Sequence, residues 1–418
     1  MLNKLKPKSE FSRNVLTLMT GTSIAQAIPI AISPILTRIY TPEDFGMFAL
    51  YMSVASIFSV VATGRYELAI MLPKKDEDAV NIMVLSIIIA FFVSLITFLI
   101  VFIFNTQITR LLGNPEISNW LYFIPVTVLL TGIYQSLNYW SNRKKQYKRL
   151  ATSRVVQSAT TATTNLGMGF GGFGSSGLIL GGVLGQGLAS FVLGKMIWKE
   201  DRYRLKSFSK LRIFALSKKF IKFPKFNLPN ALIDSFRLSG ISILIAKFFT
   251  TSTLGQFSLA WKMIQLPISL LGSSISQVFF QKIAIEEKYK LYVIIVKFIN
   301  RATIIALPLF VLIYIFSEKL FVFIFGIDWE LAGKMASVMS PWLFFNFITS
   351  PLSTIFIKIN KQDVLLIFSI WYAMVPLLIL YFYHHIDIIQ MLTIISISMS
   401  LMLVLFIAIV LYYTKDLS

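Results

Sequence analysis

The sequence predicts an all-α integral membrane protein with about twelve transmembrane helices in two six-helix lobes, related by a pseudo-two-fold axis along the membrane normal. Three observations predict this fold: an apolar composition, recurring apolar runs and an internal repeat. Apolar residues form 56% of the 418 positions and charged residues only 14%, and the mean hydropathy is +0.74. Soluble domains contain about 25% charged residues, so this composition indicates a chain that lies in a bilayer.

Apolar runs long enough to cross a bilayer recur along the whole chain. A helix needs about 20 apolar residues to span the roughly 30 Å hydrocarbon core. We count twelve such runs, at 15–36, 45–64, 80–104, 120–139, 155–173, 177–198, 226–246, 254–280, 291–316, 331–357, 364–383 and 388–413. The polar segments between them are short and leave no extramembrane domain for an independent catalytic site. The chain is therefore not expected to be an enzyme.

A short polar break between the first two runs recurs in the second half of the chain. RIYTPEDFGMFALY begins at Arg38, and KFFTTSTLGQFSLA begins at Lys247, 209 positions later. In the first copy, Thr41 is the expected N-cap of a helix whose first residue is Pro42. Asp44 stands close to the spacing of a capping box. The break is therefore expected to be a turn between two membrane helices.

A second, looser repeat supports the division into halves. LLGNPEISNW at 111–120 and IFGIDWELAG at 324–333 each precede the fourth run of their half. Two halves with six spans each share one orientation in the membrane, as in transporters that work by alternating access. We expect an N-terminal lobe at 1–198, a basic cytoplasmic linker at 199–225 and a C-terminal lobe at 226–418.

Lysine and arginine are distributed unevenly between the two sides that these spans define. The formal net charge is +20, and 29 of the 39 basic residues fall on the side of the N-terminus. Positive residues favour the cytoplasmic side, so both termini are expected in the cytoplasm and the protein in the cytoplasmic (inner) membrane. The basic segments at 142–154 and 199–225 are expected to rest on anionic membrane lipids, and no nucleic-acid partner is expected.

Several kinds of chemistry have no support in the sequence. There is no cysteine and no nucleotide-binding GxxxxGK[ST] motif. Gly167, Gly169 and Gly172 match GxGxxG by letter, but no predicted strand precedes them, which argues against a dinucleotide site. The two histidines, His384 and His385, have no set of further ligands at a spacing that suits a metal. No catalytic residue, metal or cofactor is expected.

Polar residues inside the spans are the candidates for function, because a charge at the centre of a membrane helix costs about 2.5 to 3.5 kcal/mol. The span at 226–246 carries four such residues on one helix face, at Asn227, Asn230, Asp234 and Arg237. Asp234 and Arg237 also have the spacing of a purely structural ion pair. The sequence leaves both interpretations of this pair open.

Two further spans carry polar residues that could line a central cleft. Lys262 and Gln265 lie in the span at 254–280, and Arg65 and Glu67 follow the span at 45–64. Cations inside spans favour an anionic ligand, and arginine can hold phosphate oxygens in a bidentate manner. We expect substrate binding by Arg237, Lys262, Asn230 and Gln265, and gating or ion coupling by Asp234, Arg65 and Glu67.

Three segments are similar to a known family. They are IYTPEDFGMFALY from Ile39, GRYELAIMLP from Gly64 and LFVFIFGIDWELAG from Leu320. Together they resemble polysaccharide biosynthesis membrane proteins of the O-antigen flippase type, which belong to the multidrug/oligosaccharidyl-lipid/polysaccharide exporter superfamily. The resemblance covers essentially the whole chain and is most specific in the first 80 residues.

The resemblance implies export, without ATP, of a lipid-linked oligosaccharide that is built on polyprenyl pyrophosphate. Such a substrate would carry the repeat unit of O-antigen, and hence of lipopolysaccharide, or of a similar surface polysaccharide. The Arg-Glu pattern of the family falls on Arg65 and Glu67, and its cationic cavity helix falls on the span that contains Arg237. Lys262 is added from its position alone. A polysaccharide polymerase and chain-length proteins are the partners that this role implies.

Three other functions stay open. A multidrug or cation antiporter of the same superfamily would typically carry acidic residues in its first span, and none lies at 15–36. A peptidoglycan-precursor flippase has similar chemistry, but that family resembles fourteen spans rather than twelve. A membrane polysaccharide polymerase or ligase would be an enzyme, and it would be expected to carry a large outer loop, which the short loops here do not provide.

Overall fold

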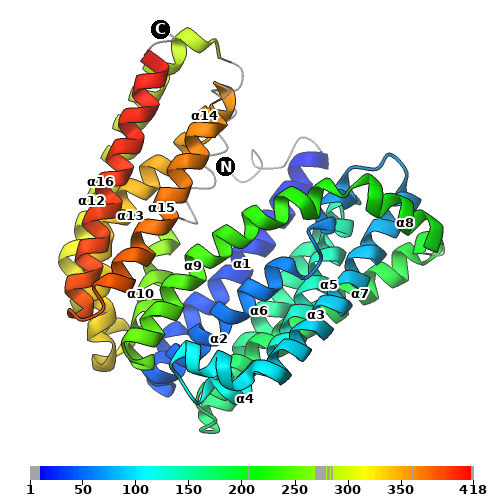
Figure 1. Ribbon diagram of the computed structural model, residues 1–418, viewed down its shortest axis with the longest axis horizontal. Helices are drawn as coiled ribbons and strands as arrows, with labels where there is room; N and C mark the ends of the chain where they lie inside the picture. Colours follow the sequence, from blue (N-terminus) through cyan, green and yellow to red (C-terminus); the bar gives the residue numbers. More distant parts are fainter. Residues whose placement is uncertain are drawn as a thin grey trace, which may run out of the picture. The chain divides into compact units, whose positions relative to one another are not determined.

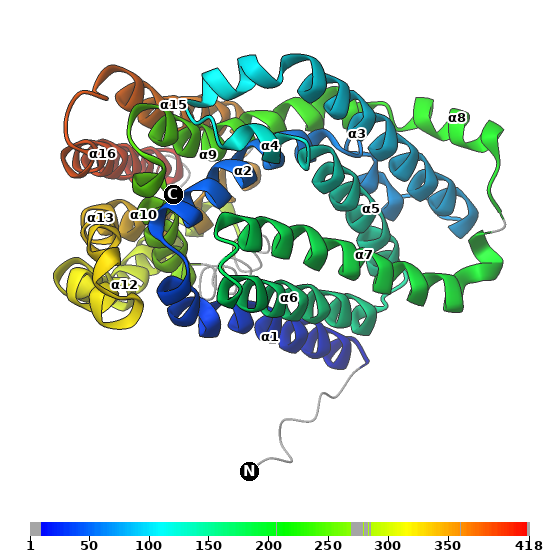
Figure 2. The same cartoon turned by 90° about the horizontal axis from the view of Figure 1, so that it is seen from below.

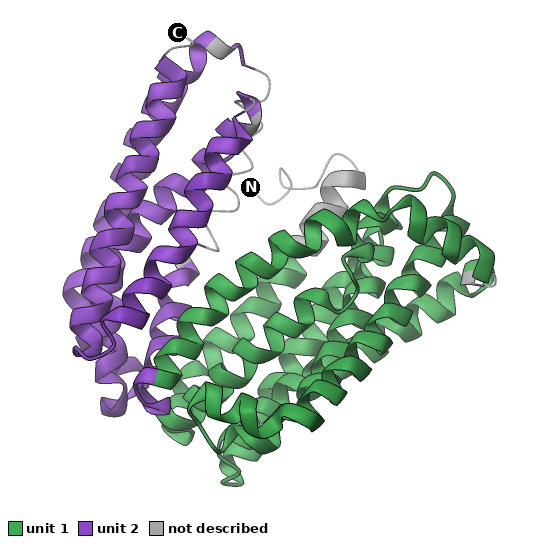
Figure 3. Cartoon of the chain, in the orientation of Figure 1, with its two compact units in different colours: residues 1–247 green, residues 248–418 purple. Residues whose placement is uncertain are grey.

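The computed structural model describes residues 10–205, 207–268, 279, 283, 286–359 and 361–415. Within these ranges every regular element is a helix (Figure 1), which confirms the predicted all-α class. The helices form two compact units, Met1–Lys247 and Phe248–Ser418 (Figure 3). Each unit has its own helix packing.

The first unit is built from long helices that pack side by side (Figure 2). In chain order its elements are α1 (Glu10–Ile39), α2 (Pro42–Val61), η2 (Tyr66–Met71), α3 (Asp76–Leu112), α4 (Ile117–Leu121), α5 (Ile124–Arg143), α6 (Tyr147–Phe170), α7 (Ser175–Leu205), α8 (Lys210–Lys219), η3 (Phe223–Asn227) and α9 (Leu228–Phe248). Helix α6 packs between α1 and α7, and α5 packs against α2, α3 and α7. Helix α8 packs against α3.

The second unit is organised around α13. Its elements are α10 (Thr251–Pro267), η5 (Lys288–Lys290), α12 (Leu291–Phe325), η6 (Ile327–Trp329), α13 (Glu330–Leu352), α14 (Ile355–Lys358), α15 (Gln362–Phe382) and α16 (Ile388–Lys415). Helix α13 packs against α10, α12 and α16, and α15 packs against α16. Of the span expected at 254–280, positions 269–278 and 280 lie outside the described residues.

The internal repeat of the sequence is also a repeat of helix boundaries. Three boundaries recur 209 positions later in the chain: the end of α1 at Ile39 and of α9 at Phe248, the start of α2 at Pro42 and of α10 at Thr251, and the end of α5 at Arg143 and of α13 at Leu352. The offset is that of the two polar breaks in the sequence. Both halves of the chain therefore fold into helices in the same order.

The N-cap predicted at Thr41 is present. Thr41 Oγ1 accepts a hydrogen bond from the Asp44 amide at 3.2 Å, and the Asp44 carboxylate accepts one from the Thr41 amide at 2.9 Å. This reciprocal pair is a capping box, and it satisfies amides that have no partner inside the helix. In the second copy, Thr250 caps α10 by accepting from the Thr253 amide at 3.1 Å.

The border between the two compact units lies at Lys247, so α9 is grouped with the first unit. The repeat instead places α9 at the start of the second lobe, because its end corresponds to the end of α1. Contacts inside the first unit account for the grouping: the Ser56 hydroxyl of α2 lies 2.7 Å from the Ser239 hydroxyl of α9. The lobe boundaries expected from the repeat stay a prediction.

Eight of the described helices are long and apolar enough to cross a membrane. They are Thr20–Ile39, Pro42–Val61, Asp76–Leu112, Ile117–Arg143, Ser175–Arg204, Leu291–Phe325, Gln362–Phe382 and Ile388–Lys415. Together with the fold they make the chain a multi-pass membrane protein. The other four expected spans, at 155–173, 226–246, 254–280 and 331–357, are not among the eight.

Helix α6 shows how a polar helix can still belong to a membrane bundle. Gln157 donates to Gln186 of α7 at 2.5 Å, and the hydroxyl of Ser158 donates to the carbonyl of Ala25 in α1 at 2.7 Å. Polar side chains that find partners on neighbouring helices do not have to face lipid. The mean hydropathy of such a helix therefore underestimates its ability to lie in a membrane bundle.

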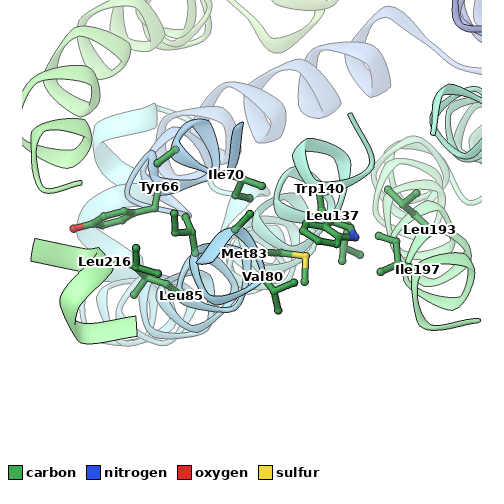
Figure 4. Close-up of a cluster of buried hydrophobic side chains, with 13 residues drawn as sticks. Tyr66, Ile70, Val80, Met83, Leu85, Leu137, Trp140, Leu193, Ile197 and Leu216 are labelled. Carbon is green, nitrogen blue, oxygen red and sulfur yellow. The ribbon is translucent and has the colours of Figure 1, made fainter. Parts of the chain in front are cut away.

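A cluster of buried apolar side chains holds one end of the first unit together (Figure 4). It joins η2, α3, α5, α7 and α8, with Trp140 of α5 fully buried near its centre. The indole of Trp140 donates to Asp201 at 3.1 Å, and Arg149, which is also buried, bonds to Asp201 at 2.7 Å and to Glu200. Helices α5, α6 and α7 are thereby fixed to one another at this end.

A test of the turn after α12 uses two glycines that both have open space around them. Gly326 has φ 107° and ψ 166°, a region that is essentially restricted to glycine, whereas Gly167 lies inside α6. We expect Gly326→Ala to lower the free energy of unfolding by about 1–3 kcal/mol. Gly167→Ala should leave it unchanged or raise it by up to about 1 kcal/mol. Thermal unfolding in detergent measures both, and equal midpoints for the two variants would contradict the assigned backbone.

Candidate functional site

A pocket of about 530 Å³ lies within the first unit, between α2, the start of η2 and α9. Polar side chains contribute to its wall, namely Ser56, Arg65, Asn227, Asn230, Asp234, Ser235 and Ser239. A polar concave site on membrane helices is costly to maintain against lipid and marks a candidate for ligand binding.

One face of α9 supplies most of these polar groups. Asn227, Asn230 and Asp234 follow each other at spacings of three and four residues, which places them on the same side of the helix. Asn227 is the last residue of the π-helical turn η3, and such turns are frequent at functional sites. The polar face predicted from the sequence therefore lines the pocket.

Arg65 reaches the pocket from a tight turn after α2. Gly64 and Arg65 both have positive φ, 58° and 63°, and this conformation costs a residue other than glycine on the order of 1–3 kcal/mol. Backbone strain of this kind is concentrated at functional sites. The turn brings Arg65 into the pocket wall, with its side chain 25% exposed.

Glu67 lies behind Arg65 and is 1% exposed. Its carboxylate accepts a hydrogen bond from the Thr63 hydroxyl and lies 3.5 Å from the Arg65 guanidinium. A buried carboxylate needs such partners because burial without them is very costly. Glu67 is not part of the pocket wall, and its position suits it to hold Arg65 in place.

Asp234 and Arg237 form the pair that their spacing allows, at 3.8 Å. The Asp234 side chain is 74% exposed and lines the pocket, whereas Arg237 is 28% exposed and is not among the residues of the wall. At about 100° per residue, position 237 lies only about 20° around the helix from Asn230. It is at the edge of a wall that continues on the other side through Ala231, Ser235 and Ser239.

Lys262 and Gln265 lie three residues apart on α10, in the second unit. The pocket of the first unit does not include them. The structure thus brings together Arg65, Asn230 and Asp234, with Glu67 beside Arg65. The role of each of these candidate residues stays a prediction.

Sequence reasoning did not identify Ser235 and Ser239 as part of the site. Both are buried on α9 and contribute to the pocket wall. The contact between Ser56 and Ser239 joins α2 to α9 across the pocket. Serine is common in membrane helices, so the spacing of these residues carried no distinctive signal.

The wall offers one cation, one carboxylate and several amide and hydroxyl groups. Amides and hydroxyls can both donate and accept hydrogen bonds, as sugar hydroxyls require. The Arg65 guanidinium is suited to a phosphate or carboxylate group. Among the residues that the structure describes, no cluster of three or more His, Cys, Asp or Glu could hold a metal ion.

The two carboxylates of the site differ in burial, and this difference predicts different effects on stability. Glu67→Gln removes a charge that is hydrogen-bonded and nearly fully buried, so we expect the free energy of unfolding to fall by about 1.5–3 kcal/mol. Asp234→Asn removes an exposed charge and should change it by less than about 1 kcal/mol. Thermal unfolding of both purified variants tests this, and a loss for Asp234→Asn as large as that for Glu67→Gln would contradict the geometry described for Glu67.

Solved structures of transporters share this fold along almost the whole chain. An inward-facing multidrug resistance MATE family transporter of the MOP superfamily matches with a TM-score of 0.72 and 15% identity, covering 96% of each chain. The lipid II flippase MurJ matches with a TM-score of 0.71 and 14% identity, covering 96% of this chain and 87% of MurJ. A MOP superfamily transporter from Pyrococcus furiosus, described as having a binding pocket of reverse polarity, matches with a TM-score of 0.59 and 15% identity over 94% of each chain. At these identities the likeness shows the fold alone.

Sequence comparison gives the family. The teichuronic acid biosynthesis protein TuaB of Bacillus subtilis (strain 168) is 20% identical over 275 residues, which are 64% of this chain and 54% of TuaB. The match thus spans about half the length of that relative. The family model described as polysaccharide biosynthesis protein matches residues 35–333, well over half of the 418 residues. The chain therefore belongs to the polysaccharide biosynthesis protein family.

Proposed function

We propose that this protein is a flippase that moves a polyprenyl-pyrophosphate-linked oligosaccharide across the cytoplasmic membrane by alternating access. The substrate would be a repeat unit of O-antigen or of a similar surface polysaccharide. The observation that carries the proposal is the pocket of the first unit, where Arg65 lies among amide and hydroxyl groups. The polysaccharide biosynthesis family and the MOP transporter fold support this class of function.

The pocket groups match the two polar parts of such a substrate. Asn227, Asn230 and the serine hydroxyls of the wall can exchange hydrogen bonds with sugar hydroxyls. Arg65 presents a planar guanidinium that can hold phosphate oxygens in a bidentate manner, which a lysine cannot do. The pocket is large enough for part of an oligosaccharide, and the polyprenyl chain would stay in the lipid.

Arg237, Lys262 and Gln265 extend this proposal beyond the pocket wall. Arg237 and Lys262 would add positive charge for the pyrophosphate as the substrate passes, and Gln265 would bind sugar. Glu67 and Asp234 are the candidates for coupling transport to an ion. Coupling to the membrane potential would supply about 2.3 kcal/mol per charge for each 100 mV.

The cellular setting follows from the same proposal. Both termini would lie in the cytoplasm, as the distribution of basic residues predicts. A polysaccharide polymerase and chain-length proteins would act on the exported repeat units. The protein itself would perform no covalent chemistry.

A multidrug or cation antiporter is the second candidate function. The observation that favours it is Asp234, because its exposed carboxylate lines the pocket and could attract a cation. The first span, however, holds no acidic residue at 15–36. The transport assay below distinguishes the two functions by the charge of the substrate that moves.

Transport by reconstituted protein tests the role of Arg65. In proteoliposomes with a fluorescent polyprenyl-pyrophosphate oligosaccharide, Arg65→Ala should lower the initial rate of translocation at least about 10-fold, the effect of losing a charge-assisted hydrogen bond of about 1.5 kcal/mol or more. Arg65→Lys should be intermediate, because it keeps the charge but loses the bidentate geometry. Arg110→Ala, an exposed arginine at the end of α3, is the matched control and should leave the rate unchanged.

Two outcomes of this assay would overturn the proposal. One is a rate for Arg65→Ala equal to that of the parent chain. The other is transport of a cationic dye, with loss of that transport in Asp234→Asn and no movement of the lipid-linked oligosaccharide. The second outcome would establish the antiporter.

An experiment in cells tests the proposed role of Arg237 and Lys262, the two cations outside the pocket wall. Arg237→Ala and Lys262→Ala should each reduce surface polysaccharide while the amount of protein in the membrane is unchanged, because each removes positive charge from the path of the pyrophosphate. Polysaccharide staining and immunoblotting of membranes measure both quantities. Parental polysaccharide in both variants would contradict a cationic path.

A further inference from the structure

Helix α8 is apolar on two opposite sides. Ile213 and Leu216 face the protein and pack on the buried cluster of the first unit, where Leu216 is visible in Figure 4. Leu211 and Phe214 lie on the other side and are 83% and 61% exposed. The protein core can cover one apolar side of a helix. A second apolar side needs another apolar environment to cover it.

The exposed side of α8 is surrounded by positive charge. The segment 207–225 contains six lysines and arginines and no aspartate or glutamate. Lys210 and Arg212 flank Leu211 in the sequence and are exposed. The Lys218 ammonium lies 4.4 Å from the centre of the Phe214 ring. Apolar side chains beside long cationic ones are typical of helices that lie in the headgroup region of a membrane.

Hydrogen bonds fix α8 at the end of a membrane helix. The buried amide of Asn81, in the second turn of α3, donates to the Ser207 carbonyl at 3.1 Å and accepts from the Ser209 amide at 2.9 Å. At the other end of α8, the Tyr66 hydroxyl donates to the Ser217 carbonyl at 2.9 Å. Burial raises the pKa of Tyr66 above its usual value. These hydrogen bonds therefore hold α8 next to the first turns of α3.

We propose that the outer face of α8, formed by Leu211 and Phe214 with the cations around them, binds anionic phospholipids of the surrounding bilayer. The apolar side chains would enter the boundary between headgroups and acyl chains, and the cations would bind lipid phosphates. Asp76 and Glu77 of α3 lie beside Ser207, at the start of the segment, but the segment 207–225 itself holds six cations and no acidic residue. Charge complementarity therefore selects an anionic lipid surface over a zwitterionic one as the partner of this face. This surface lies on the side predicted to be cytoplasmic and is separate from the pocket.

The test uses the absence of cysteine from the chain. Leu211→Cys gives a single thiol, which is labelled with bimane, and the protein is reconstituted into vesicles of phosphatidylcholine and phosphatidylglycerol. Bromine, a quencher of bimane, is placed on the acyl chains of one lipid or the other at equal mole fraction. Brominated phosphatidylglycerol should quench at least about two-fold more strongly than brominated phosphatidylcholine, because cations attract anionic headgroups.

Two variants provide the controls. Phe170→Cys labels a side chain that is 75% exposed at the end of α6, in the stretch 155–194 that contains no lysine or arginine. The two brominated lipids should quench it equally. In Leu211→Cys, the combined changes Lys210→Gln, Arg212→Gln, Lys218→Gln and Lys219→Gln should bring the ratio of quenching by the two lipids close to one.

The bimane label on Leu211→Cys, without the four glutamine substitutions, decides the proposal. The test therefore does not depend on whether the neutralised variant folds. Equal quenching at position 211 by both lipids would show contact with the bilayer without a preference for anionic lipid. No quenching by either lipid would show that water or another protein covers this face. Each result would overturn the proposal, and neither depends on the transport activity of the protein.

Discussion

Hydrocarbon offers a polar group no hydrogen-bonding partner, and this constraint governs how the helices of this protein begin, pack and carry charge. Helix α2 begins at a capping box because its first amides need acceptors. Helix α6 keeps Gln157 and Ser158 inside the bundle because α7 and α1 supply their partners. Glu67 is buried as a carboxylate because Thr63 and Arg65 surround it. Polar groups in this chain are therefore informative about either packing or ligand binding.

The pocket of the first unit is the site that we propose for ligand binding. Asn227, Asn230 and Asp234 form one continuous polar face, and Arg65 enters from a turn with a costly backbone conformation. Glu67 lies 3.5 Å from the Arg65 guanidinium and neutralises part of its charge. An arginine among amides and hydroxyls suits a phosphorylated sugar, and our proposal for the substrate rests on this geometry together with the family.

The surface of α8 differs from the pocket in its pattern of charge. Its charges have one sign, its apolar side chains are exposed, and its backbone is fixed to α3 and η2 by Asn81 and Tyr66. A surface that faces anionic headgroups can use positive charge alone. The first unit thus presents two polar regions whose charge patterns fit two different kinds of lipid-derived ligand.

The helical class, the repeat at an offset of 209 residues, the cap at Thr41 and the polar face of α9 could all be predicted from the amino-acid sequence. The cap and the polar face depend on residues close together in the chain, whose spacing fixes which side of a helix they share, and the repeat depends on two similar segments. The sequence did not reveal that Ser56 meets Ser239, that Glu67 is buried, or that Arg65 lines the pocket while Arg237 does not. These depend on which helices pack together and on the left-handed turn at Arg65, neither of which local spacing can specify.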